Sequence, residues 1–175
     1  MSRPDVRRIS IDGVLGQGVY SKDVILRIIA ELGVNGGIGY AYEFSGTAIQ
    51  AMNMEARMSI CNMSIEGGAR VGYINPDDVT FEYLDGRPYA PKDMARATAF
   101  WQSIASDDDA DYDDIVVLDA DTIEPMVTWG INPGQAIGVT KTTPEIASLP
   151  NEERETAEQA YQHMDLEESQ PVGGI

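Results

Sequence analysis

The sequence has little cysteine, histidine or lysine. Its 175 residues include one cysteine, Cys61, one histidine, His163, and three lysines. One cysteine cannot form an internal disulfide, and it cannot hold a zinc ion or an iron–sulfur cluster alone. No Ser-His-Asp or Cys-His set can be named, and His163 lies in a polar stretch, where we expect an exposed histidine.

Long hydrophobic runs are also missing. The longest apolar stretch, residues 24–34, is interrupted by Arg27 and Glu31, whereas a membrane-spanning helix requires roughly 20 consecutive apolar residues. The N-terminal residues alternate between polar and apolar side chains and do not form the apolar core of a signal peptide. We therefore expect no transmembrane helix and a cytoplasmic location.

Basic residues are far outnumbered by acidic ones. The chain has 12 Lys and Arg against 29 Asp and Glu, which gives a formal net charge of -17. Such a charge repels phosphate backbones and anionic lipid headgroups, so we expect neither nucleic acid nor membrane as a partner. The excess of aspartate over lysine is typical of a salt-adapted surface. An ordinary acidic protein with a solvated loop at residues 107–114 is the other interpretation.

The length and hydrophobic content predict one folded domain. Hydrophobic residues make up 43% of the chain, enough for a core at this size. Strand and helix patterns alternate, which is typical of the α/β class. Strands are predicted at 5–12, 40–44, 115–118 and near 126–129, and helices at 21–32, 54–69, 76–84, 93–105 and 150–164.

Three residues carry the capping signals of the predicted helices. Ser21, Asn53 and Asn75 each precede a helical pattern and have a side-chain oxygen that can accept a backbone N–H. We expect a partial α/β domain over residues 1–166. Residues 167–175 show no helix or strand periodicity. We therefore expect a tail or a truncation point, with no helix or strand to hold it against the domain.

The helix predicted from Met54 carries the candidate catalytic pair. Asn62 and Glu66 are four residues apart, which places an amide and a carboxylate on one helix face beside an apolar row of Met58, Cys61 and Ile65. The pair could contact one ligand. It could also belong to a polar stripe that faces water, a stripe whose members are Glu55, Ser59, Asn62 and Glu66.

Several longer motifs resemble one family. The Cys61–Glu66 stretch, Cys-Asn-Met-Ser-Ile-Glu, is the most specific of them. The others are Gly18–Leu26, Gly36–Tyr40, Glu43–Gly46, Met54–Ala69, Pro76–Tyr83, Gly86–Lys92 and Val127–Gln135. Together they cover most of the chain, which resembles the large subunit in the isopropylmalate dehydratase branch of the aconitase family of iron–sulfur hydro-lyases.

The resemblance implies a fold and an activity. The fold would be a three-layer α/β/α aconitase-type domain, here incomplete. The intact enzyme would interconvert 2-isopropylmalate and 3-isopropylmalate in leucine biosynthesis by removing and re-adding water. Glu66 would act near the leaving hydroxyl, and Asn62 would line the cofactor site. The partners implied are the remainder of the large subunit, a small swivelling subunit and an isopropylmalate-type substrate.

The family's cofactor is a 4Fe-4S cluster, and its ligand cysteines are absent from this chain. The family holds the cluster with one cysteine in a Gly-Ser-Cys-Thr-Asn type segment and two in a Cys-x-x-Cys pair, which the resemblance places beyond Ile175. Cys61 is not a ligand in this family, so we expect a buried hydrophobic role for it. The isolated chain is therefore expected to be inactive. A homoaconitase or aconitase relative and a non-catalytic assembly module remain the alternatives.

Overall fold

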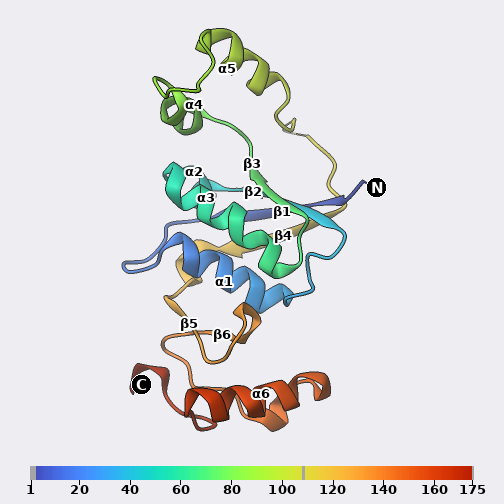
Figure 1. Ribbon diagram of the computed structural model, residues 1–175, viewed down its shortest axis with the longest axis vertical. Coiled ribbons are helices and arrows are strands. Elements are labelled where there is room, and N and C mark those ends of the chain that lie inside the picture. The colour runs from blue at the N-terminus through green and yellow to red at the C-terminus, as the bar shows by residue number, and fades with distance from the viewer. Residues whose placement is uncertain (1–2, 108, 175) are drawn as a thin grey trace.

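A four-stranded parallel sheet forms the centre of the molecule. The computed structural model describes residues 3–107 and 109–174. The strands are β1 (Asp5–Asp12), β2 (Tyr40–Ser45), β3 (Val71–Ile74) and β4 (Asp114–Asp119), in the order β3-β2-β1-β4 (Figure 1). Helices connect successive strands, as parallel pairing requires. The α/β class predicted from the sequence is confirmed.

Helices α1 (Ser21–Leu32) and α3 (Met54–Met63) cover one face of this sheet. A short helix, α2 (Thr47–Gln50), follows β2. Side chains at alternate strand positions point toward the helices, because successive residues of a strand face opposite sides. The largest fully buried side chains of the resulting core are Tyr42, Phe44, Ile9, Ile11, Ile25, Ile28, Ile29, Ile49 and Ile60.

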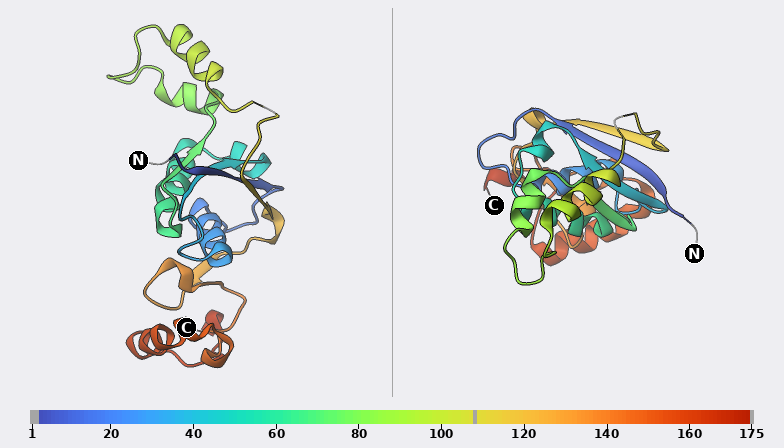
Figure 2. Two further views of the ribbon diagram at one scale, coloured as in Figure 1. Left: turned by 90° about the vertical axis from the view of Figure 1, so that its right-hand side faces the viewer. Right: turned by 90° about the horizontal axis from the view of Figure 1, so that it is seen from above.

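The opposite face of the sheet is incompletely covered by the described residues. On β4, Ile115 and Val117 point away from α1 and are 57% and 69% exposed. Parallel sheets are normally buried on both faces, so the three-layer arrangement lacks part of one helical layer. Between β3 and β4 the chain forms an extension with α4 (Asp78–Leu84) and α5 (Met94–Ser103), which stands away from the sheet (Figure 2).

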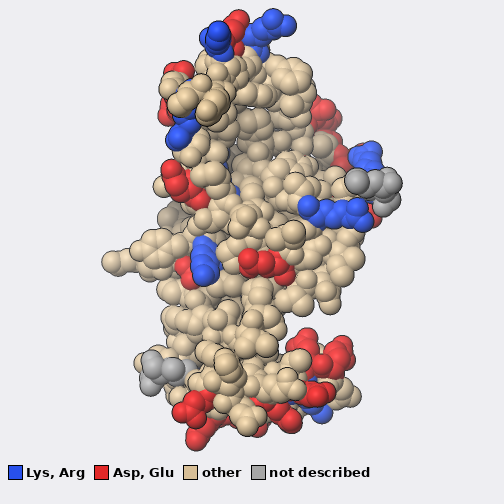
Figure 3. All heavy atoms as spheres, viewed as in Figure 1, with Lys and Arg blue, Asp and Glu red and all other residues tan. Residues whose placement is uncertain are grey.

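A second, smaller core lies at the C-terminal end. It joins an antiparallel pair, β5 (Met126–Thr128) and β6 (Ala136–Gly138), to helix α6 (Asn151–Met164). Its centre is Trp129 against Tyr161, with ring centroids 5.2 Å apart. Figure 3 shows acidic side chains gathered at this end of the molecule. His163 of α6 is exposed, as predicted.

Short 3-10 helices complete the secondary structure. They are η1 (Ser64–Gly67), η2 (Ala120–Thr122), η3 (Pro133–Gln135), η4 (Ile146–Ser148) and η5 (Val172–Gly174). Across residues 3–107 and 109–174, no helix is both long enough and apolar enough to cross a membrane.

Two of the three predicted helix caps are wrong. Asn53 does cap α3 by accepting the Ala56 N–H at 2.9 Å. Ser21, however, is the first residue inside α1. Asn75 lies before the cap of α4, which is Asp77. The Asn75 side chain instead donates to Glu43 at 3.1 Å, so tertiary contact overrides its local capping preference.

The C-terminal segment is held in place, contrary to the expected tail without an element to hold it. Pro171 forms an isolated antiparallel bridge with Thr142. The backbone N–H groups of Ser169 and Val172 donate to Thr143 and Lys141, respectively. These contacts join residues far apart in the sequence, which a local pattern cannot reveal.

Candidate functional site

A cavity of about 750 Å³ lies where three segments meet. The segments are the first turns of α1, the end of α3 with η1, and β5 with the loop that follows it. The described residues that line the cavity are Lys22, Asp23, Leu26, Asn62, Met63, Glu66, Met126, Val127, Thr128, Gly130, Ile131, Asn132 and Pro133. Asn62 and Glu66 therefore share one cavity, although both are also exposed to solvent.

The helix that carries this pair is shorter than predicted. α3 ends at Met63, and Glu66 belongs to the 3-10 turn η1 rather than to a helix that continues to residue 69. The Gly68 N–H donates to Ile65 and the Ala69 N–H donates to Ser64, and Gly68 adopts a left-handed conformation with φ 87°. This pattern of bonds ends helices at glycine. It turns the chain toward β3 directly after Glu66.

The apolar row expected on α3 is also wrong. Met58 and Ile65 are 44% and 70% exposed. The buried positions of α3 and η1 are instead Arg57, Ile60, Ser64 and Gly67. The sequence pattern did not predict this buried face because it includes Arg57. Charged residues are almost never fully buried unless they are paired.

Cys61 is half-buried against the main core, which agrees in part with the role expected for it. Burial raises the pKa of its thiol to about 11, although the charge of Arg57 acts in the opposite direction. The thiol is therefore protonated near neutral pH, and a protonated thiol is a poor metal ligand and nucleophile.

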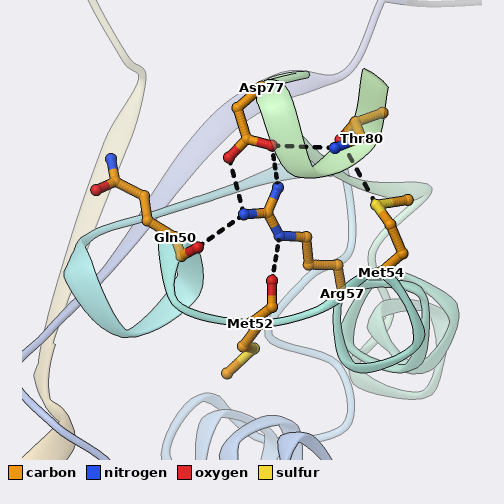
Figure 4. Close-up of polar contacts among 6 residues, drawn as sticks. All are labelled: Gln50, Met52, Met54, Arg57, Asp77 and Thr80. Carbon is orange, nitrogen blue, oxygen red and sulfur yellow. Dashed lines mark hydrogen bonds and ion pairs between the residues drawn. The ribbon is translucent and has the colours of Figure 1, made fainter. Parts of the chain in front are cut away.

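Arg57 explains why α3 lies where it does (Figure 4). The Arg57 residue is 2% exposed, and its guanidinium group donates to both carboxylate oxygens of Asp77, at 2.6 and 2.8 Å. It also donates to the backbone carbonyls of Met52 and Gln50, at 3.0 and 2.9 Å. The Arg57 side chain thus joins α2, α3 and the cap of α4, and so holds the helix that leads to Asn62 and Glu66.

Asp23 fixes the facing wall of the cavity. One of its carboxylate oxygens accepts the Tyr20 N–H and the other accepts the Met126 N–H, each at 2.7 Å. The first bond satisfies a donor at the start of α1, and the second ties β5 to that helix. Both oxygens of Asp23 are therefore engaged in positioning the wall.

Unlike the Asp23 carboxylate, the side chains of Glu66 and Asn62 are available to contact a ligand. Neither side chain makes a hydrogen bond or ion pair with residues 3–107 or 109–174. A free carboxylate can accept a proton and its protonated form can donate one, and a free amide can both donate and accept hydrogen bonds. The spacing left the two residues open between a ligand site and a solvent-facing stripe, and the family resemblance singled them out. Lys22 and Asp23 on the facing helix were missed as part of the cavity.

A second cavity, of about 250 Å³, lies on the less covered side of the sheet. Its buried carboxylate, Glu43, accepts four side-chain hydrogen bonds, from Tyr73, Asn75, Ser106 and Tyr112, at 2.6–3.1 Å. Burial and the Glu43 contact raise the pKa of Tyr73 to about 12. Because both oxygens of Glu43 are satisfied, this network anchors the two ends of the α4–α5 extension.

Metal ligation was tested on the side chains that are present. Among the described residues, no three His, Cys, Asp or Glu side chains are grouped so that they could hold a metal ion. An iron–sulfur cluster is normally held by several cysteine thiolates. The residues of this chain therefore do not fit a cluster.

Comparison with known proteins gives a consistent result. The sequence model of the Aconitase family (aconitate hydratase) matches residues 1–175. Large subunits of 3-isopropylmalate dehydratase from Salinibacter ruber and Microcystis aeruginosa are 58% and 59% identical over 177 and 174 residues. The one from a Synechococcus species is 60% identical over 176 residues. These alignments cover 99–100% of this chain but 37–38% of each relative, so the chain spans little more than a third of their length.

Proposed function

Because the chain belongs to the aconitase family, we propose that it is part of a hydro-lyase that interconverts 2-isopropylmalate and 3-isopropylmalate in leucine biosynthesis. One observation carries the proposal: Asn62 and Glu66, with no protein partner among the described residues, line the same cavity. The names of the relatives support this choice of substrate.

The proposed chemistry requires a group that moves a proton at the substrate hydroxyl. Hydroxide is a poor leaving group, so a carboxylic acid that donates a proton to the hydroxyl oxygen lets it depart as water. Glu66, as its carboxylic acid, would donate this proton while the C–O bond breaks, and the proton of the neighbouring C–H bond would pass to a base in the remainder of the assembled enzyme. The Glu66 carboxylate would take its proton back when water adds in the reverse direction. Asn62 would hold the hydroxyl in line through its amide, which stabilises the reacting geometry.

The cavity also suits the substrate's isopropyl group. Leu26, Met63 and Val127 contribute apolar surface to the same cavity that holds Asn62 and Glu66. Sites for small molecules commonly combine an apolar lining with a few polar groups that set the orientation. This combination favours a substrate with one branched apolar arm and several oxygens.

The family's 4Fe-4S cluster would supply an iron that polarises the departing hydroxyl. The described residues do not fit such a cluster, so no step is assigned to a cluster held by this chain. The proposal instead places the cluster, the remainder of the large subunit and the small subunit in the assembled cytoplasmic enzyme.

The isolated chain should bind no cluster. After anaerobic reconstitution with iron and sulfide, we expect no iron–sulfur absorption, because one half-buried thiol with a raised pKa cannot replace a set of thiolates. A full-length relative reconstituted in parallel is the positive control. A stoichiometric cluster on the isolated chain would contradict the expectation.

A segment exchange tests the proposed function. In the assembled Salinibacter ruber enzyme, these 175 residues would replace the matching segment of the large subunit. We expect isopropylmalate turnover within about tenfold of the parent enzyme, or about 1.4 kcal/mol of activation free energy. An assembled but inert enzyme would favour the non-catalytic module. A gain of citrate or homocitrate turnover would favour the aconitase or homoaconitase alternative.

A further inference from the structure

We propose that Lys22 binds a carboxylate of the substrate in the cavity lined by Asn62 and Glu66. This inference rests on the proposed function, because it assumes an anionic hydroxy acid at that site. It adds a residue that neither the Cys-Asn-Met-Ser-Ile-Glu motif nor the spacing of the helix identified.

Lys22 is the one cation among the described residues that line this cavity. Its ammonium group is exposed and makes no ion pair or hydrogen bond within residues 3–107 and 109–174. The ion pairs described are Arg7 with Asp114, Arg27 with Glu31, and Arg57 with Asp77. Lys22 and Glu66 thus face one cavity without pairing, which leaves space for a ligand that contacts both.

The position of Lys22 on its helix is unfavourable for stability. It is the second residue of α1, where the positive end of the helix dipole repels cations and favours acids. Asp23, the next residue, does follow this preference, since its carboxylate accepts the Tyr20 N–H. A residue that opposes a local rule without a compensating contact in the fold is expected at functional sites.

The net charge of the chain also favours a substrate-binding role for Lys22. With a net charge of -17, the field of these 175 residues is unfavourable to a dicarboxylate substrate. Glu66 adds a further negative group inside the cavity when it is ionised. A local cation offsets this repulsion, and a lysine ammonium forms charge-assisted hydrogen bonds with carboxylates.

Lys22 and the Asn62–Glu66 pair lie on different segments of the cavity wall, so they would contact different groups of the substrate. Lys22 on α1 would hold one carboxylate, while Glu66 and Asn62 on the facing segment would contact the hydroxyl. Lys22 contacts the carboxylate equally in the bound substrate and during the reaction. Its loss should therefore weaken binding, whereas loss of Glu66 should slow the chemical step.

The test compares steady-state constants in the assembled enzyme that carries this segment. Lys22→Met should raise KM for isopropylmalate roughly 10- to 100-fold, the scale of a lost hydrogen bond to a charged group, with kcat nearly unchanged. Lys22→Arg should recover part of the affinity. Lys92→Met, at an exposed lysine that does not line the cavity, is the matched control and should leave KM unchanged.

Salt separates a direct contact from a general charge effect. Molar salt screens long-range attraction almost completely, so the KM ratio between Lys22→Met and the unaltered enzyme should persist there. A ratio that falls to one in high salt overturns the direct contact.

The outcomes also separate the two proposals. An unchanged KM in Lys22→Met, together with a kcat lowered by Glu66→Gln, overturns the role of Lys22 and leaves the proposed function standing. An unaltered enzyme that does not turn over isopropylmalate overturns both. Equal unfolding midpoints for Lys22→Met and Lys92→Met would show that any KM difference does not come from misfolding.

Discussion

Replacing Arg57 by methionine should lower the free energy of unfolding by about 3 kcal/mol. The substitution keeps much of the side chain's apolar bulk but removes every bond that the guanidinium group donates. The carbonyl oxygens of Met52 and Gln50 and the carboxylate of Asp77 each lose a donor. Because the Asp77 side chain is 39% exposed, water replaces part of the lost contact, and the expected loss is at the low end for a broken buried pair.

Urea unfolding followed by circular dichroism measures this loss. Arg70→Met is the matched control, since Arg70 is exposed and lies after the turn that ends η1. We expect its unfolding free energy to stay within about 0.5 kcal/mol of the original chain. Equal stability of the two variants would show that the Arg57 contacts do not hold α3.

The pH dependence of Arg57→Met should also differ from that of the original chain. Burial raises the pKa of Asp77, but the hydrogen bond and charge of Arg57 outweigh it, so the net pKa is lowered. A carboxyl with a lowered pKa stabilises the fold above its unfolded pKa, and this contribution is lost as pH falls through the folded value. The stability difference between the two chains should therefore shrink in acid.

Replacing Glu66 by glutamine should lower kcat in the assembled enzyme by about 100-fold or more, the usual effect of losing a positioned acid–base group. Glutamine keeps the size of the side chain and its capacity to accept a hydrogen bond, but it cannot exchange a proton. KM should change much less, because the amide can still contact the substrate. Initial rates over a range of isopropylmalate concentrations separate the two constants.

Glu55→Gln is the matched control for this prediction. Glu55 lies on the same helix, is exposed and does not line the cavity, so its loss should leave kcat unchanged. If the two variants have equal rates, Glu66 belongs to the solvent-facing polar stripe, and the acid–base role assigned to it is wrong.

Local sequence patterns predicted much of the fold. The strand at 5–12 was placed correctly because its apolar residues alternate, and the helix predicted at 21–32 has the bounds of α1. Strand β3 was missed, because its sequence, Val-Gly-Tyr-Ile, contains a glycine, which weakens a strand pattern. Strand β6, Ala-Ile-Gly, was missed because alanine and glycine are both depleted in strands.

The candidate site shows where local patterns fail. The family resemblance singled out Asn62 and Glu66, and the helix whose spacing would place them on one face ends before Glu66. They still line one cavity because η1 follows α3 without a break, and Ser64 at the junction keeps helical backbone angles. Lys22 and Asp23 lie some 40 residues earlier in the chain, and only the packing of α1 beside α3 brings them to the same cavity.

The most direct test of the central claim is a crystal structure of the assembled enzyme with isopropylmalate bound, in which one distance is measured. The account predicts that a carboxylate oxygen of Glu66 lies within about 3 Å of the substrate's hydroxyl oxygen, directly or through one water. A substrate bound beside Glu43, or a Glu66 side chain that points into solvent away from the ligand, would contradict it.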